Sequence, residues 1–221
     1  MRQIAIDGPA GAGKSTIAKA VSKDLEFVYI DTGAMYRAIG LYVLRNKVSK
    51  DDEAKVVELA KACDVTISYE NGEQVVFLNG ENVNGFIRTP EVGEYASAIS
   101  VYKEVREKLV SLQQDLAKTR DVVMDGRDIG SKVLPNATLK VYLDADVNVR
   151  AKRRFDELTA KGETVDLATL TEEMKARDYR DMHRDNSPLV RVPDAKYVDS
   201  SYMTPDEVKE KIIELFNEAD K

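Results

Sequence analysis

A glycine-rich stretch that ends in lysine and serine constrains this chain more than any other segment. Residues 8–15 read GPAGAGKS and match the phosphate-binding pattern G-x-x-x-x-G-K-[S/T]. The apolar run 2–7 before the stretch predicts a strand, and the helical spacing of apolar residues over 17–25 predicts a helix after it. Strand, loop and helix in this order form the context in which such a loop binds the phosphates of a nucleoside triphosphate.

The parts of this loop have separate expected roles. Glycines let successive backbone N–H groups point at phosphate oxygens beside the positive end of a helix. Lys14 is expected to reach the outer phosphates and Ser15 to ligate Mg²⁺. A plain glycine turn at a helix start is the alternative. The residues predicted to bind the donor are Gly8, Pro9, Ala10, Gly11, Ala12, Gly13, Lys14, Ser15 and Thr16.

Composition limits the class of protein. The 221 residues, 43% hydrophobic and 33% charged, are enough for one α/β domain with small insertions. A formal net charge of -6 provides no overall positive field for nucleic acid or an anionic membrane. Neither a secretory signal nor an apolar stretch of membrane-spanning length is present, so we expect a cytoplasmic protein.

Single cysteine and histidine residues exclude further chemistries. Cys63 has no second thiol with which to form an internal disulfide, and we expect it to be buried at a helix end. His183 lies in a charged helical stretch, where a solvated side chain is the usual outcome. A clustered His/Cys metal site and Ser-His-Asp catalysis are therefore not expected.

Strand and helix patterns alternate along most of the chain. Strands are predicted at 27–30, 122–124, 139–143 and 197–198, and helices around 35–44 and from 147. The middle differs, because the β-like runs 64–69 and 74–78 flank Asn71-Gly72 and a second Asn-Gly stands at 79–80. The predicted fold is an α/β P-loop three-layer fold with a central parallel sheet and a small antiparallel β insert. The segment 204–207 predicts a capped start of the final helix.

Arginines accumulate in the second half of the chain. Arg127 follows an apolar strand within the run 125–130, DGRDIG, and so is expected at the carboxyl edge of the sheet, where ligands bind in open α/β folds. Phosphoryl transfer between two anionic molecules needs fixed positive charge around both of them. Arginine supplies that charge with bidentate geometry.

Four stretches together resemble one known family. They are 8–15, 31–37 (DTGAMYR), 125–130 and 177–181 (RDYRD) with Arg184, and in order and length they are similar to bacterial-type cytidylate kinases over nearly the whole chain. The resemblance implies a transferase that moves the γ-phosphoryl group of ATP to CMP or dCMP with Mg²⁺, in pyrimidine metabolism. It also implies a monomer with a single domain, 1–221, that contains an NMP-binding insertion at about 33–105 and a lid at about 148–170.

The resemblance also implies roles for individual residues. Arg37, Arg127 and Arg184 would hold the acceptor phosphate. The base would be recognised by Ser97, Arg106 and Asp128, and the sugar by Arg177 and Asp181. The predicted substrate-binding residues are Thr32, Tyr36, Arg37, Ser97, Arg106, Arg127, Asp128, Arg177, Asp181 and Arg184.

The chemistry of Asp128 agrees with its implied role. Its carboxylate can accept a hydrogen bond from the exocyclic amino group of cytosine, whereas uracil places a carbonyl oxygen there. Asp128 should therefore favour CMP over UMP. Alternatives stay open for two other positions: Asp181 could be an i,i+4 partner of Arg177, and Ser97 could be a surface serine.

Arg150 and Arg154 are one turn apart at the start of a charged helix, and are expected to close over the ATP phosphates. Solvated helix charge is the alternative. Asp31 and Asp125 could orient Mg²⁺-bound waters, although Asp31 could simply cap the following helix. The predicted catalytic residues are Lys14, Arg127, Arg150, Arg154 and Arg184.

Three rival functions remain. Another P-loop kinase, acting on UMP, AMP or shikimate, has no reason to carry the 126–128 run together with Arg106 and Asp181. A nucleotide-dependent switch selective for guanine would carry an Asn/Thr-Lys-x-Asp stretch, which the chain lacks. Nucleic-acid binding conflicts with the acidic balance, 7% aromatic residues and no tryptophan.

Overall fold

The computed structural model describes residues 1–70 and 72–221. Position 71, and with it half of the first expected Asn-Gly turn, lies outside the described residues. The chain forms two compact units. We call residues 1–28 with 120–221 the core unit and residues 29–119 the insert unit. The expected insertion, about 33–105, falls inside the insert unit.

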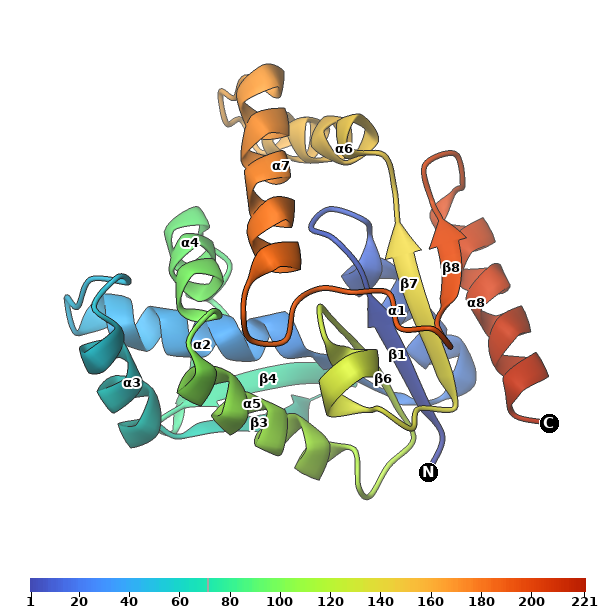
Figure 1. Ribbon diagram of the computed structural model, residues 1–221, viewed down its shortest axis with the longest axis horizontal. Coiled ribbons are helices and arrows are strands. Elements are labelled where there is room, and N and C mark those ends of the chain that lie inside the picture. Colours follow the sequence, from blue (N-terminus) through green and yellow to red (C-terminus); the bar gives the residue numbers. More distant parts are fainter. Residues whose placement is uncertain (71) are drawn as a thin grey trace. The chain divides into compact units, whose positions relative to one another are not determined.

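A five-stranded sheet has the order β2-β6-β1-β7-β8 (Figure 1). Its strands are β1 (Gln3–Asp7), β2 (Val28–Asp31), β6 (Val122–Gly126), β7 (Leu139–Asp144) and β8 (Lys196–Asp199). β1 pairs in parallel with β6 and β7, and β7 with β8, which confirms the predicted parallel sheet. Apolar residues fill β1, β6 and β7 almost continuously, as expected for strands covered on both faces.

Helices of the core unit pack on this sheet. α1 (Lys14–Leu25) and α8 (Pro205–Ala219) contact each other, and Phe27 meets Phe216 edge to face with ring centroids 5.5 Å apart. Thr204 and Glu207 form the predicted capping box of α8. α6 (Val147–Ala160) packs against α7 (Leu167–His183), as Figure 1 shows. A short π-helix, η1 (Ile129–Val133), follows β6 and was not expected.

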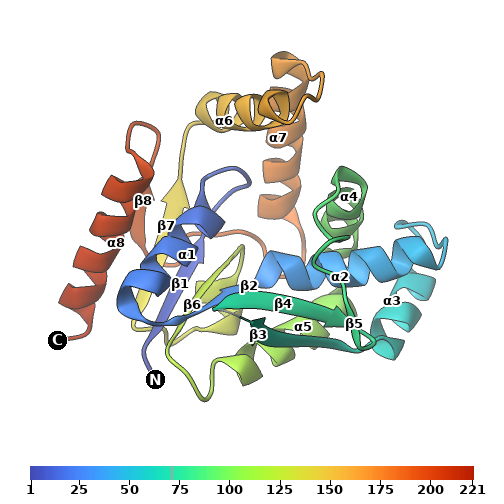
Figure 2. The ribbon, with the colours of Figure 1, turned by 180° about the vertical axis from the view of Figure 1, so that it is seen from behind.

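The insert unit combines helices with a second sheet. Its helices are α2 (Thr32–Arg45), α3 (Glu53–Ala62), α4 (Pro90–Ile99) and α5 (Lys103–Leu116). The antiparallel strands β3 (Val65–Glu70), β4 (Glu73–Leu78) and β5 (Glu81–Asn82) confirm the predicted β insert. Figure 2 shows α2 running alongside β4, which it contacts. The helix end expected at Cys63 is the end of α3, whereas no pattern in the sequence predicts α5.

Two lone side chains behave as expected. Cys63 is buried at the end of α3, where burial raises the pKa of its thiol. His183 ends α7 as an exposed side chain stacked on Tyr179, with ring centroids 4.0 Å apart. Within residues 1–70 and 72–221, no helix is long and apolar enough to cross a membrane.

Candidate functional site

The phosphate-binding loop joins β1 to α1 in the core unit. A Cβ on Gly8 would lie 1.9 Å from the Leu143 carbonyl oxygen, so only glycine allows this close approach. Gly13 caps α1 with φ 88°, a left-handed conformation that glycine adopts without strain. The loop therefore has the backbone shape that its glycines predict, with free helix-terminal amides beside it.

Lys14 is buried within this loop, with 6% of its surface exposed. Its Nζ donates to the Pro9 carbonyl oxygen at 2.7 Å. Burial, reinforced by the charge of Arg127, lowers the pKa of Lys14 well below its ordinary value, and the charge of Asp125 opposes the shift. An anion at the loop would reverse that lowering, because it would stabilise the ammonium form.

Ser15 and Asp125 form a pair of oxygen ligands next to the loop. The Ser15 hydroxyl donates to Asp125 Oδ2 at 2.8 Å, and the serine is exposed whereas the aspartate is buried. A hydroxyl beside a carboxylate is a donor set that suits Mg²⁺. Thr16, the next residue on α1, is exposed.

Asp31 has a different role from Asp125. Its Oδ1 accepts the Ala34 amide at 2.9 Å, which caps α2, and its Oδ2 pairs with Arg88 at 2.5 Å. The helix-cap interpretation of Asp31 is confirmed. Within the part of the chain that the structure describes, no group of three or more His, Cys, Asp or Glu side chains gathers as a metal cluster.

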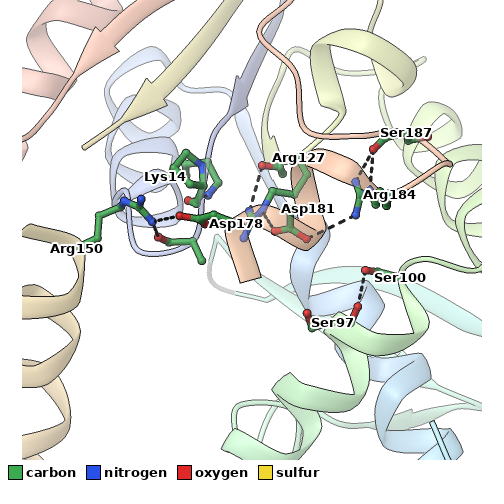
Figure 3. Close-up of polar contacts among 12 residues, drawn as sticks. Lys14, Ser97, Ser100, Arg127, Arg150, Asp178, Asp181, Arg184 and Ser187 are labelled. Atoms are coloured by element: carbon green, nitrogen blue, oxygen red, sulfur yellow. Dashed lines mark hydrogen bonds and ion pairs between the residues drawn. The ribbon is translucent and has the colours of Figure 1, made fainter. Parts of the chain in front are cut away.

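A cluster of arginines surrounds Asp181 in the core unit, as the dashed contacts in Figure 3 show. Arg127 Nε donates to Asp181 Oδ2 at 2.9 Å, and Arg184 Nη1 lies 3.9 Å from Asp181 Oδ1. Arg184 also donates from Nε and Nη2 to the Ser187 carbonyl oxygen, at 2.8 and 2.6 Å. Burial favours the neutral form of Asp181, but the charges of Arg127 and Arg177 outweigh it and lower the pKa of this carboxyl.

The structure thus places five charged side chains of the core unit close enough for their charges to act on one another: Lys14, Arg127, Arg177, Asp181 and Arg184. The fields of Arg127, Arg177 and Asp181 all act on Lys14, which lies in the phosphate loop. Several fixed guanidinium groups beside a loop of backbone amides make a strongly anion-attracting site.

Arg150 and Arg154 have unlike surroundings, although both lie on α6. Arg150 is buried: Nη1 pairs with Asp178 at 2.7 Å and donates to the Ala10 carbonyl at 2.9 Å, and Nε donates to the Ala145 carbonyl at 2.8 Å. Arg154 keeps 40% of its side chain exposed and pairs with Glu157 at 2.8 Å. Of these two arginines, Arg150 is the one that contacts the phosphate loop, through the Ala10 carbonyl.

Two buried carboxylates near the site have no predicted role in the sequence. Asp178 is the buried partner of Arg150, and nothing in the pattern of α7 distinguishes it from the exposed acidic residues there. Asp7 is buried at the end of β1 and accepts backbone amides from η1, just after Asp128. A signal for Asp7 existed: it is a carboxylate at the carboxyl end of an apolar strand, directly before the phosphate loop.

The remaining expected substrate residues lie in the insert unit. Thr32, Tyr36 and Arg37 share the first turns of α2, and Arg37 Nη1 donates to the Ile87 carbonyl at 3.2 Å. The Arg106 guanidinium lies 5.4 Å from the centre of the Tyr36 ring and donates to the Ser100 carbonyl at 3.0 Å. Ser97 lies on α4, half-buried, and its carbonyl accepts the Ser100 hydroxyl (Figure 3).

Comparisons with known proteins point to one family. A family model described as cytidylate kinase matches residues 4–218. A cytidylate kinase from Caldicellulosiruptor bescii is 54% identical, over 96% of this chain and 94% of that protein. One from Lactobacillus gasseri is 46% identical, over 100% of this chain and 96% of that protein. A gluconokinase structure from Sinorhizobium meliloti shares the fold, with a TM-score of 0.51 and 12% identity over 98% of this chain and 92% of that chain.

Proposed function

The chain belongs to the cytidylate kinase family, and on that premise we propose that it transfers the γ-phosphoryl group of ATP to CMP or dCMP, giving ADP and CDP or dCDP. One observation in the structure carries the proposal beyond the family match. The charges of Arg127, Arg177 and Asp181 act on Lys14 in the phosphate loop. The arginine cluster is therefore close enough to the loop to interact with a phosphate bound there. Transfer between two anions needs that concentration of positive charge.

The donor is held by residues 8–16. Backbone amides of the loop and of the first turn of α1 bind the phosphate oxygens, and Lys14 leaves the Pro9 carbonyl to reach the outer phosphates. The exchange is favourable because a buried ammonium gains more from a phosphate anion than from a neutral carbonyl.

Magnesium fits the residues beside the loop. Ser15 and Asp125 present a hydroxyl and a carboxylate 2.8 Å apart, and we assign Ser15 as the ligand and Asp125 as the group that orients bound water. When bound, Mg²⁺ neutralises charge on the donor phosphates. Asp31 is not part of this site, since its oxygens cap α2 and pair with Arg88.

We assign Arg37, Arg127 and Arg184 to the acceptor phosphate, as the family resemblance implies. Because that phosphate is already a nucleophilic anion near neutral pH, no side chain has to act as a strong general base. Arg177 and Asp181 bind the sugar, and Asp181 keeps its charge through its low pKa.

We assign base selection to Asp128, Ser97 and Arg106, as the family resemblance implies. Asp128 is buried at the start of η1, so its carboxylate distinguishes a donor from an acceptor with little help from water. An acceptor facing that carboxylate would lose a hydrogen bond and gain repulsion, at a cost of about 1–3 kcal/mol. CMP is therefore preferred to UMP.

α6 contributes two arginines to donor closure. Arg154, partly exposed and held by one carboxylate, is free to turn toward the ATP phosphates. Arg150 binds the Ala10 carbonyl of the loop and the Asp178 carboxylate. If Arg150 leaves these partners for a donor phosphate, the closure of α6 depends on bound donor. Such coupling limits transfer to water, because the site is complete only when substrates are present.

The cellular setting follows from the reaction. Substrates and products are pyrimidine nucleotides, so we place the protein in pyrimidine metabolism. A monomer in the cytoplasm is what the family resemblance implies. Light scattering of the purified protein checks the oligomeric state, and fractionation of cells checks the location.

An acceptor panel tests the function. ADP formation from Mg²⁺-ATP is measured with CMP, dCMP, UMP, AMP and no acceptor. We expect rates with CMP and dCMP to exceed the rate with UMP by tenfold or more, in line with an energetic difference of about 1–3 kcal/mol. Equal rates for all acceptors, or no dependence on acceptor, would overturn the proposal.

A further inference from the structure

Asp7 occupies a junction between two functional segments. It is the last residue of β1 and is followed at once by the phosphate loop. In the parallel register it lies opposite Gly126 of β6, the residue before Arg127 and Asp128. The phosphate loop (residues 8–15) and the turn that carries Arg127 and Asp128 thus leave the sheet from neighbouring strands. Asp7 lies where these two segments begin.

Each carboxylate oxygen of Asp7 accepts one backbone amide from the beginning of η1. Oδ1 accepts from Ile129 at 2.8 Å and Oδ2 from Gly130 at 2.7 Å. A Cβ on Gly130 would lie 3.3 Å from Oδ2 and 3.2 Å from Lys140 Cδ, so the turn fits tightly against the carboxylate. A symmetric carboxylate can satisfy two consecutive amides, whereas an amide side chain of the same size offers one oxygen and one N–H group.

We propose that Asp7 is a positioning residue for acceptor specificity, which fixes the turn that carries Asp128 by holding the two amides that follow it. Asp128 immediately precedes both amides and begins η1. Discrimination by a buried carboxylate depends on its placement to a few tenths of an ångström, because hydrogen bonds weaken steeply with misalignment. The inference rests on the proposed role of Asp128 in reading the base.

Charged and titratable groups from several elements surround Asp7. Asp128 and Lys14 act on its charge with opposite signs, Tyr142 of β7 lies opposite it in register, and the Lys140 stem packs on the same turn. Burial raises the pKa of Asp7 to about 6, although both backbone amides oppose the rise. Protonation turns one accepting oxygen into a donor and loosens the turn, so the specificity should depend on pH in that range.

The test compares selectivity rather than rate. The ratio of kcat/KM for CMP to that for UMP is measured at pH 7.5 in the wild type and in Asp7→Asn, with Asp206→Asn on exposed α8 as the matched control. Losing a charge-assisted hydrogen bond should reduce the ratio about tenfold in Asp7→Asn, with a smaller change in KM for ATP and no change in the control. A folded Asp7→Asn protein with the wild-type ratio would overturn the inference.

A second measurement uses the wild type alone, so it does not depend on the folding of the variant. The ratio of kcat/KM for CMP to that for UMP is followed from pH 8 to pH 5. Both nucleotides ionise at the same phosphate group, so the effect of that ionisation cancels in the ratio. We expect the ratio to fall below about pH 6, and a ratio that is flat to pH 5 contradicts the inference. If the wild type does not phosphorylate CMP at all, the proposed function itself is wrong. A wild type that phosphorylates CMP with a flat ratio contradicts only the role of Asp7, so the two failures are distinguishable.

Discussion

Two sets of ion pairs on the same pair of helices have opposite characters. Arg150 of α6 and Asp178 of α7 meet with only 6% and 11% of their side chains exposed, next to the phosphate loop. One turn along α6, Arg154 and Glu157 meet with 40% and 50% exposed. The residue types are alike, but the buried pair also binds backbone carbonyls and has no water to replace a lost partner.

Charged side chains near the phosphate loop are therefore fixed by several protein partners. On the outer faces of α6 and α7, water can replace the partner of a charged side chain. Outer pairs such as Lys152–Asp156 and Lys175–Glu172 connect neighbouring turns of one helix. Pairs of this kind contribute about 0.3–0.5 kcal/mol each. Removing a partner from the inner set should therefore affect both folding and catalysis, and removing one from the outer set should leave folding intact.

The largest expected effect is on catalysis, from Lys14→Ala. Lys14 is the one cation that belongs to the loop itself, and without it no ammonium opposes the charge that develops on the transferred group. We expect kcat with ATP and CMP to fall by about 10³-fold or more. Steady-state ADP formation measures it, and a decrease of less than tenfold would contradict the assigned role. Thermal unfolding should show that the variant still folds, because a buried ammonium with a lowered pKa adds little stability.

Arg150→Ala should give the largest loss of stability. It leaves Asp178 charged and buried without its guanidinium partner, which typically costs about 3–5 kcal/mol. Urea unfolding measures the change. The matched control is the double variant Arg150→Ala/Asp178→Ala, which removes both charges and should recover part of the loss. If the single and double variants are equally stable, the pair is not coupled as described.

The pH dependence of stability separates Asp7 from ordinary carboxylates. Because its folded pKa is raised to about 6, the folded protein holds a proton that the unfolded chain has lost, so this contribution to stability grows as pH falls from about 6 to 4. The gap in unfolding free energy between wild type and Asp7→Asn should shift in favour of the wild type by up to about 3 kcal/mol over that range. Asp181 has the opposite sign, since its pKa is lowered and its contribution is lost on acidification. Urea unfolding at several pH values checks this, and a pH-independent gap would contradict it.

Arg154→Ala should give the smallest change, confined to turnover. Its single partner, Glu157, is half exposed and also pairs with Lys161, so the free energy of unfolding should change by less than about 0.5 kcal/mol. If Arg154 closes over the donor phosphates, kcat should fall by about tenfold. Lys152→Ala, two residues earlier on α6 and with no role assigned at the donor, is the control. Unchanged turnover in Arg154→Ala would assign the residue to the solvated face of α6.

Much of the fold was predictable because its signals are local. The glycine pattern of residues 8–15 identified the strand, loop and helix at the beginning of the chain, and the β-like runs around 64–78 identified the antiparallel insert. Of α3 only the end at Cys63 was expected, and α5 was not predicted, since the apolar positions of both helices are few among charged residues. η1 was also not predicted. Its five residues show no helical repeat of apolar positions, and its conformation depends on packing against β1.

The environment of the site was less predictable than its residue types. Arg150 and Arg154 look equivalent in the sequence, and only the packing of α6 against α7 buries one and leaves the other partly exposed. The partners of Asp7 are backbone amides more than a hundred positions away, and a backbone amide leaves no mark in the sequence. Long-range contacts of this kind appear only when the sheet register is known.

The central claim is that the cationic cluster beside the phosphate loop, Lys14 with Arg127, Arg177 and Arg184, stabilises the phosphoryl group during transfer. Arg127 tests this claim most directly. Initial rates of ADP formation from Mg²⁺-ATP and CMP are compared for the wild type, Arg127→Ala, and Arg2→Ala, which removes an exposed guanidinium paired with Asp121. We expect kcat/KM for CMP to fall by about 10²-fold or more in Arg127→Ala and to stay at the wild-type value in Arg2→Ala. A folded Arg127→Ala protein that phosphorylates CMP as well as the wild type would contradict the account.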